Sequence, residues 1–110
     1  MSELTGRQRR RLRALAHGLD PVVHVGKGGL TDEVVAQVGR ALESHELVKV
    51  RFLDGKPARA ELGPELARRT GAREAGGVGH VAILFRPHPD PGKRRIRLDG
   101  GSDRNEEALG

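Results

Sequence analysis

The first apolar pattern along the chain has the period of a helix. Its members lie three or four positions apart on one helical face: Leu12, Leu15 and Ala16. Thr5 and Gln8 precede them at the spacing of a capping box, in which each side chain accepts a hydrogen bond from the other residue's backbone N–H. The pattern predicts a helix over about 6–17 whose apolar face packs on a core.

The next two patterns predict a strand and a second helix. A β-branched run after Asp20 and Pro21 predicts a strand near 22–25. Thr31 then fits the N-cap of a helix that ends near residue 45. The apolar residues of that helix again recur three and four positions apart: Val34, Val35, Val38, Ala41 and Leu42.

After the second helix the pattern changes from alternating to continuously apolar. The stretch LVKVRF alternates, so that its apolar and basic residues face opposite ways. The two sets are Val48, Val50 and Phe52 against Lys49 and Arg51. They predict a half-buried strand with a basic outer face. The apolar run over 81–85 is typical of a central strand near 80–86, and an additional strand over 74–78 stays open.

Two signals compete between these strands. Asp54 and Gly55 together are typical of a hairpin turn. Pro64 at the first position of a helix, with Gly71 just after its end, predicts a short helix instead. We favour the helix, because the proline and the glycine occupy the helix ends that each residue prefers.

The predicted order of elements is helix, strand, helix, strand, helix, strand, strand. This order indicates an α/β fold of the α+β type, with two layers in which a mixed sheet packs against helices. The 110 residues suffice for one domain, which we place over 1–86. Residues 87–110 combine proline, glycine and both charges with little to bury, so we expect a disordered tail.

Composition narrows the class of partner. Lys and Arg number 20 against 15 Asp and Glu, a formal net charge of +5, which favours anionic partners such as nucleic acid. A membrane surface fits less well, because the apolar face of the first helix offers only Leu and Ala. No apolar run approaches a membrane span, and no signal-type segment occurs, so we expect a cytoplasmic protein. We also expect it to be a monomer.

Catalytic and metal chemistry find little support in the residue types. The chain has no cysteine, which excludes disulfides, thiolate metal sites and cysteine nucleophiles. Its five histidines show no spacing of metal ligands. We therefore expect no catalytic residue, no metal, no cofactor and no small-molecule substrate.

The stretch HVGKGGLTDE, residues 24–33, allows three interpretations. Its glycines partly match a dinucleotide fingerprint, but Thr31 replaces the third glycine, and too little chain follows for a doubly wound sheet. One glycine could serve only to make a tight turn. The third interpretation is a G-x-x-G clamp, in which a sugar–phosphate backbone approaches the main chain closely and a lysine supplies charge. Its residues would be Gly26, Lys27, Gly28 and Gly29.

Basic side chains from two other elements favour the clamp. On a helical wheel the arginines of the first helix oppose its leucines, with Arg9 at the border. These arginines are Arg7, Arg10, Arg11 and Arg13, and Lys49 and Arg51 add to them from the basic face of the strand. The chain has only two aromatic residues, Phe52 and Phe85, which disfavours RNA-binding folds that stack bases on aromatic platforms.

Together these segments resemble a known family, the CRM domain (chloroplast RNA splicing and ribosome maturation), and most closely its small bacterial single-domain members of the YhbY type. The resemblance covers about residues 4–86 and lies in four successive segments: LTGRQRRRLRALAHGLDPVVHVGKGGLTDEV, ALESHELVKVRF, ARRTGA and LFR. Gly63 and Pro64 depart from the family's unbroken third helix, which could be shortened or kinked here. The tail is not part of the shared pattern.

The resemblance implies a fold similar to the C-terminal domain of translation initiation factor three. It also implies that the G-x-x-G loop and neighbouring basic residues contact RNA, and that bacterial members associate with precursors of the large ribosomal subunit. We therefore expect a non-enzymatic protein that binds ribosomal RNA in ribosome assembly. Two alternatives stay open, namely a protein-interaction module whose basic face docks an acidic partner, and a nucleotide-binding protein.

Overall fold

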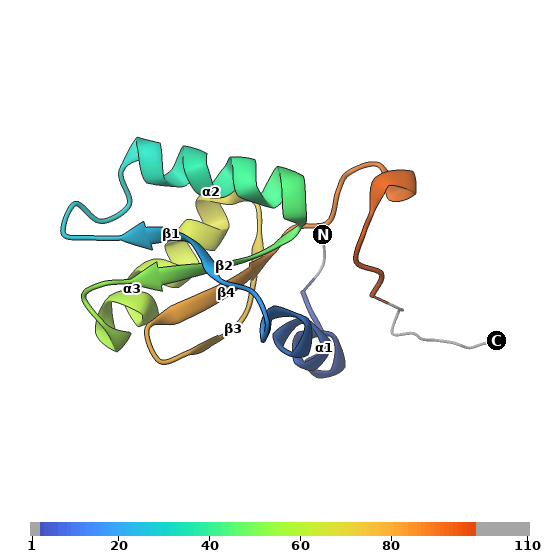
Figure 1. The fold of residues 1–110 in the computed structure, drawn as a ribbon, viewed down its shortest axis with the longest axis horizontal. Helices are drawn as coiled ribbons and strands as arrows, with labels where there is room; N and C mark the ends of the chain where they lie inside the picture. The colour runs from blue at the N-terminus through green and yellow to red at the C-terminus, as the bar shows by residue number, and fades with distance from the viewer. Residues whose placement is uncertain (1–2, 99–110) are drawn as a thin grey trace.

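The computed structural model describes residues 3–98 and contains the predicted elements in the predicted order (Figure 1). The elements are α1 (Gly6–Ala16), β1 (Pro21–Val25), α2 (Asp32–His45), β2 (Leu47–Phe52), α3 (Lys56–Thr70), β3 (Arg73–Val78), β4 (Val81–Phe85) and a short 3-10 helix, η1 (Pro91–Lys93). The strand that the sequence left open over 74–78 is therefore present, as β3.

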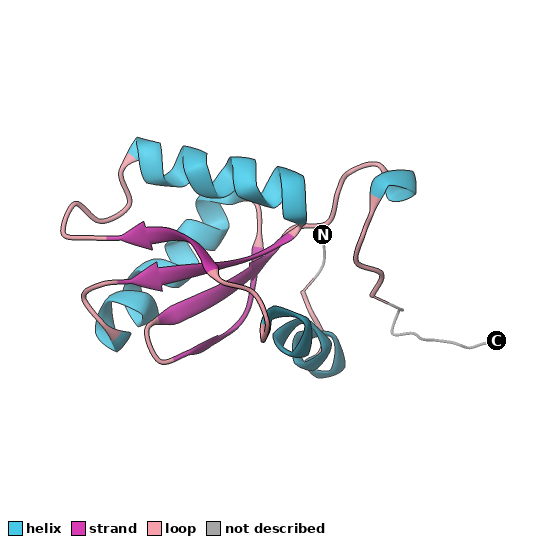
Figure 2. Cartoon of the chain, in the orientation of Figure 1, coloured by secondary structure: helices cyan, strands magenta, loops and turns pink. Residues whose placement is uncertain are grey.

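The four strands form one mixed sheet in the order β1-β2-β4-β3. β1 and β2 run parallel, and α2 makes the crossover that a parallel pair requires. β4 lies between β2 and β3 and is antiparallel to both (Figure 2). The predicted mixed sheet is thus confirmed.

Helices cover both faces of this sheet, so the fold has three layers rather than the two that we expected. β4 shows why, because its alternate residues enter two separate cores. Ala82 and Leu84 belong to the core under α2 and α3, whereas Ile83 and Phe85 belong to the core under α1. The continuous apolar run in this strand already indicated burial on both faces.

Each face has a core of its own, which we call the α2–α3 core and the α1 core. The buried residues of the α2–α3 core are Val23, Val25, Val38, Leu42, Val48, Val50, Phe52, Leu66, Ala67, Ala72, Ala82 and Leu84. Those of the α1 core are Leu4, Leu12, Ala16, Leu47, Ala75, Ile83 and Phe85. The alternation predicted for LVKVRF is confirmed, because Val48, Val50 and Phe52 face α2 and α3, while Leu47 at the start of the stretch lies on the α1 side.

The predicted N-caps of α1 and α2 are present. The Thr5 hydroxyl accepts a hydrogen bond from the Gln8 N–H at 3.1 Å, and the Gln8 side chain accepts one from the Thr5 N–H at 2.9 Å. The Thr31 hydroxyl accepts from the Val34 N–H at 3.1 Å. Each bond satisfies a backbone donor that the first turn of a helix leaves without an intrahelical partner.

The third helix is longer than we predicted, and it begins in a different place. α3 starts at Lys56, directly after Gly55, so Asp54 and Gly55 lead into a helix and do not turn a hairpin. Pro57, not Pro64, takes the proline-tolerant first turn, and Pro64 lies inside the helix without shortening it. The predicted end is confirmed, since Gly71 has the left-handed φ of +70° that a glycine C-cap adopts.

The C-terminal segment also differs from the expectation. Residues 87–98 are not disordered in this structure, because they form η1 and their Ile96 and Leu98 pack against the α1 core. A segment poor in apolar residues overall can still dock through two that point the same way, which composition does not reveal. Residues 99–110 of the expected tail lie outside the described part of the chain.

Candidate nucleic-acid interface

The glycine loop connects β1 to α2 and is built around two backbone hydrogen bonds. The Gly29 N–H donates to the Gly26 carbonyl at 3.0 Å, and the Thr31 N–H donates to the Gly29 carbonyl at 3.0 Å. Gly29 has a φ of +68°, a conformation that residues with a side chain rarely adopt. The tight turn therefore explains Gly29.

The turn does not explain Gly26 and Gly28. Neither has a positive φ, and an added Cβ would lie 3.9 Å from Leu53 at Gly26 and 3.4 Å from Thr31 at Gly28. The fold could thus hold a small side chain at both positions. Without one, the main chain stays open to close approach by a ligand.

The middle of the loop presents backbone donors and a cation together. Within residues 3–98, the N–H groups of Lys27 and Gly28 have no hydrogen-bond acceptor, and the Lys27 side chain is exposed. Exposed N–H groups beside a cation and close to the N-terminus of a helix are suited to an anion. The arrangement can therefore hold a phosphate group.

An arginine that the sequence analysis did not select supports this loop. Arg69, at the end of α3, donates to the Leu30 carbonyl at 3.1 Å and pairs with the Asp32 carboxylate at 3.4 Å. It thereby holds the loop where it enters α2 and places a positive charge beside one of the two acidic residues there. No local signal could have found it, because its partners lie more than 35 residues earlier in the chain.

Lys49 and Arg51 lie on the α1 side of β2, as the alternation predicted, but neither is fully available. The Lys49 ammonium donates to the Leu19 carbonyl at 2.8 Å, just after the end of α1. Arg51 is half-buried and lies beside His24 of the paired strand β1, whose side chain is exposed. These residues form a basic strip across the sheet between the glycine loop and α1.

The arginines of α1 divide into two groups. Arg7, Arg10 and Arg11 line one shallow pocket on the outer surface of the helix. Arg13 turns toward β3, where it donates to the Ala75 carbonyl at 3.3 Å and packs over Gly76. Arg9, on the border of the wheel, is half-buried. Arg7, Arg10 and Arg11 can therefore bind a ligand without first breaking a hydrogen bond such as the one that Arg13 makes.

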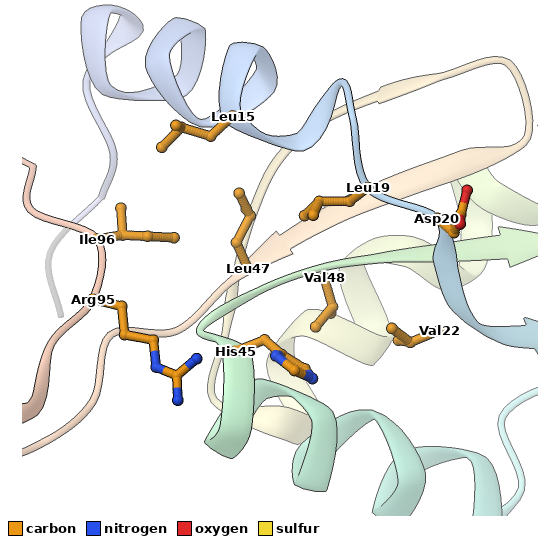
Figure 3. A pocket seen from close by; sticks show the side chains of 9 residues that line it. All are labelled: Leu15, Leu19, Asp20, Val22, His45, Leu47, Val48, Arg95 and Ile96. Carbon is orange, nitrogen blue, oxygen red and sulfur yellow. The ribbon is translucent and has the colours of Figure 1, made fainter.

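Leu15 corrects the predicted apolar face of α1. It is 41% exposed, whereas Leu12 and Ala16 are fully buried. Leu15 lies on the flank of the helix and lines a groove between α1 and the C-terminal segment (Figure 3). The wheel grouped the three residues on one side of the helix but could not show how deeply each one is buried.

Carboxylates do not neutralise the exposed arginines of α1. The described residues contain two ion pairs, Arg68 with Glu65 and Arg69 with Asp32, both made by α3. The side chains of Arg7, Arg10 and Arg11 thus face solvent without an acidic partner in this part of the chain. A helix face of this kind attracts an anionic polymer.

The candidate residues do not converge on one pocket. The glycine loop lies at one end of the sheet, on the left in Figure 1, and α1 lies under the other end. Lys49 and Arg51 lie between them, on the α1 side of the sheet. This arrangement is extended, which fits a polymer that touches several sites better than it fits a small ligand.

Three other kinds of site receive no support from the described residues. No group of three or more His, Asp or Glu residues among them could hold a metal ion. None of their helices has both the length and the apolar character needed to cross a membrane. The sheet contains a single parallel pair, whereas a dinucleotide-binding fold needs several parallel strands.

Comparison with known families decides which protein family this is. Residues 4–86 match the CRS1 / YhbY (CRM) domain, which is most of the chain. The chain belongs to the CRM domain family. The match ends just before the C-terminal segment of residues 87–98.

Individual relatives agree with this membership. An RNA-binding protein of Haemophilus influenzae is 36% identical over 88 residues, which cover 79% of this chain and 89% of that protein. The "Probable RNA-binding protein YqeI" of Bacillus subtilis is 34% identical over 84 residues, covering 76% and 88%. Both relatives are named for binding RNA and neither for catalysis.

A solved structure supports the fold as well. The solution structure of a hypothetical protein from Staphylococcus aureus, described as a candidate RNA-binding protein, superposes with a TM-score of 0.73 at 32% identity. It covers 86% of this chain and 99% of that one. The predicted α+β fold is thus shared with this solved structure.

Proposed function

We propose that this CRM domain binds RNA through its glycine loop and its α1-side basic residues, and that its target is ribosomal RNA in precursors of the large ribosomal subunit. The observation that carries the proposal is the pair of backbone N–H groups at Lys27 and Gly28, which have no acceptor within residues 3–98 and sit beside an exposed ammonium. A phosphate satisfies both donors and the charge at once.

The basic strip and α1 extend this contact along the polymer. Lys27, Arg51 and the three outward arginines of α1 supply about five cations, so we expect log K against log salt to slope at roughly −3.5 on single-stranded RNA, from about −0.7 per phosphate. Backbone contacts of this kind carry little sequence information. Selection of the ribosomal target then depends on RNA shape and on which bases are unpaired.

Substitutions in the loop test the clamp. Lys27→Ala removes the ammonium and leaves the backbone donors, so the slope should become shallower by about 0.7. Gly28→Asp adds a carboxylate beside those donors, whereas Gly28→Asn adds a side chain of the same size without charge. We expect Asp to weaken binding more than Asn, and Arg40→Ala, on the exposed surface of α2, to leave binding unchanged.

The outcomes distinguish the proposal from its alternatives. If Lys27→Ala and Gly28→Asp both bind RNA as the parent chain does, the clamp is wrong. If every basic variant binds RNA unchanged while an acidic protein partner is lost, the domain is a protein-interaction module. The ribosomal target is tested by crosslinking in cells followed by sequencing of the attached RNA, where reads spread evenly over cellular RNAs would contradict it.

A further inference from the structure

Glu46 holds the C-terminal segment against the α1 side of the domain. Its carboxylate is 2% exposed and accepts hydrogen bonds from three backbone N–H groups, those of His88 at 2.6 Å, Arg95 at 2.8 Å and Ile96 at 2.9 Å. The Glu46 carbonyl accepts a fourth, from the Arg86 N–H at 2.8 Å. A buried carboxylate with several donors fixes the chain that supplies them.

Glu46 itself sits in an unusual backbone conformation. It caps α2 with a φ of +65° and is the single residue other than glycine with a positive φ in the described chain. Such a conformation is unfavourable for a residue with a side chain and persists only where surrounding contacts require it. Burial alone would raise the pKa of Glu46, but the three backbone donors outweigh it and lower the pKa below its usual value.

The segment is also folded upon itself. The Asp90 carboxylate accepts from the Gly92 N–H at 2.9 Å, and the Arg94 guanidinium donates to the His88 carbonyl at 2.7 Å. These bonds, with Glu46 and the packing of Ile96, set the course of the chain up to residue 98. The side chains of Arg95 and Arg97 consequently face solvent from a fixed backbone, and neither has an acidic partner in the described residues.

A groove separates this segment from α1 (Figure 3). It has a volume of about 440 Å³, and its floor is aliphatic. The residues that line it are Leu15, Leu19, Asp20, Val22, His45, Leu47, Val48, Arg95 and Ile96. Leu15, Leu19 and Val22 are each more than 40% exposed, and they are three of the five large apolar side chains on the described surface.

Arginines stand on both sides of the groove. Leu15 lines the groove and also the adjoining pocket of Arg7, Arg10 and Arg11, so the two surfaces are continuous. Arg95 lines the opposite side, and Arg97 follows it two residues later. A lone carboxylate, that of Asp20, belongs to the lining that is described.

We propose that this groove binds single-stranded RNA, with phosphates on its two arginine rims and a nucleobase against the aliphatic floor. The inference rests on the proposed function and deepens it, because it names the state of the RNA and adds a second arginine rim, Arg95 and Arg97, which follows the matched residues 4–86. A duplex does not fit, since its bases are stacked and paired inside the helix.

The size and the charge of the groove argue against a protein helix as the occupant. One turn of an α-helix with side chains, 10–12 Å wide and 5.4 Å long, occupies roughly 500 Å³. The groove would hold about one turn, whereas helix docking uses anchors spread over at least two turns. Paired basic rims match the phosphates on either side of an unstacked base.

The test compares the full chain with variants of the rim and of the floor, using a 12-nucleotide single-stranded RNA of mixed sequence and a duplex of the same length. Arg95→Ser with Arg97→Ser should make the salt slope on the single strand shallower by about 1.4, from about 0.7 per phosphate. Leu15→Asn should weaken single-strand binding by roughly threefold to tenfold, less than loss of an aromatic platform, without changing the slope. Neither change should alter duplex binding.

Matched controls come from elsewhere on the surface. Leu53→Asn changes a 59% exposed leucine that does not line the groove, and Arg40→Ser removes an exposed arginine from α2. Both should bind like the parent chain. Far-UV circular dichroism melting identifies any variant that loses its fold, and Leu15→Ser then serves as the second floor variant.

The results separate the two proposals. If Lys27→Ala and Arg10→Ser weaken binding while the Arg95→Ser, Arg97→Ser double variant and Leu15→Asn do not, the groove is not an RNA site and the proposed function stands. If the rim variant weakens duplex and single strand equally and Leu15→Asn has no effect, the arginines act only as general charge, and the groove proposal is wrong. If no variant changes RNA binding, both proposals are wrong.

Discussion

The two faces of the sheet are built by different means. Twelve buried residues form the α2–α3 core, and all of them lie between positions 23 and 84. Seven form the α1 core, which is completed from both ends of the described chain, by Leu4 on one side and by Ile96 and Leu98 on the other. One face thus has a continuous apolar core. The other has a smaller core covered by an arginine-rich helix and by the C-terminal segment that Glu46 holds in place.

This difference separates stability from binding. On the α2–α3 face most apolar side chains are buried in the core, and the two ion pairs of the described residues lie there. The α1 face exposes arginines that have no acidic partner within residues 3–98. It also exposes large aliphatic residues, and a cluster of such residues marks a surface that a partner can cover. The face with less to bury is therefore the one that can give surface to RNA.

The largest effect expected is on folding, from the same substitution made on each face. Leu66→Ala should lower the free energy of unfolding by about 3–5 kcal/mol, because the larger core cannot close over the cavity. Leu12→Ala, at an equally buried position, should cost about 2–3 kcal/mol, because α1 can settle toward the sheet. Urea denaturation measures both, and a larger loss at Leu12 would contradict the division of roles.

An intermediate effect is expected from releasing the C-terminal segment. Glu46→Gln leaves one oxygen for three backbone donors, so we expect a loss of about 1–3 kcal/mol that is confined to this segment. Hydrogen exchange at the Arg95 and Ile96 amides should become fast, while β4 stays protected. Glu43→Gln, exposed on α2, is the control. Unchanged protection of these amides in Glu46→Gln would show that the Glu46 carboxylate does not hold the C-terminal segment.

The smallest effect is a pH dependence of opposite sign on the two faces. Backbone donors lower the pKa of Glu46, so its stabilisation is complete above about pH 4.5 and is lost as the pH falls through the lower folded value. Burial against α3 raises the pKa of Glu74, with Arg59 opposing the rise, so this residue costs stability at pH 7 and the cost disappears on acidification toward pH 4.5.

Denaturation of two variants between pH 7 and pH 3 checks these signs. Glu74→Gln should be as stable as the parent chain or slightly more stable at pH 7, by less than about 1 kcal/mol, and the difference should vanish near pH 4.5. Glu46→Gln should be less stable at pH 7, with a difference that shrinks only below that point. If both variants were less stable than the parent chain at pH 7, or both more stable, the opposite effects assigned to the Glu46 and Glu74 carboxylates would be wrong.

Sequence patterns predicted what local chemistry determines. The caps at Thr5 and Thr31 and the glycine end of α3 depend on residues within a few positions, and all three are confirmed. The alternation in β2 likewise follows from its own residues. The predicted start of α3 at Pro64 is wrong, because the preference of proline for the first turn of a helix fits Pro57 equally well. Only the full length of α3 shows which proline occupies that turn.

Long-range contacts could not be predicted in this way. Glu46 sits among charged residues at the end of a helix and looks solvent-facing, yet its partners come from 42 to 50 residues later. Arg13 and Lys49 were chosen as RNA contacts from their faces, but distant carbonyls engage both. The helical wheel and the strand alternation predict which way a side chain points. Whether that side chain is free to bind RNA depends on which distant parts of the chain contact it.

The placement of Ile96 and Leu98 also bears on the order in which the protein folds during its synthesis. The α2–α3 core needs nothing beyond residue 84, so it can close while the following residues are still being added. The buried residues of the α1 core end at Phe85, but Ile96 and Leu98 pack against this core only later, and Arg95 reaches its place with them. The two cores can therefore begin to pack before the groove exists, and the second arginine rim is the later of the described surfaces to form.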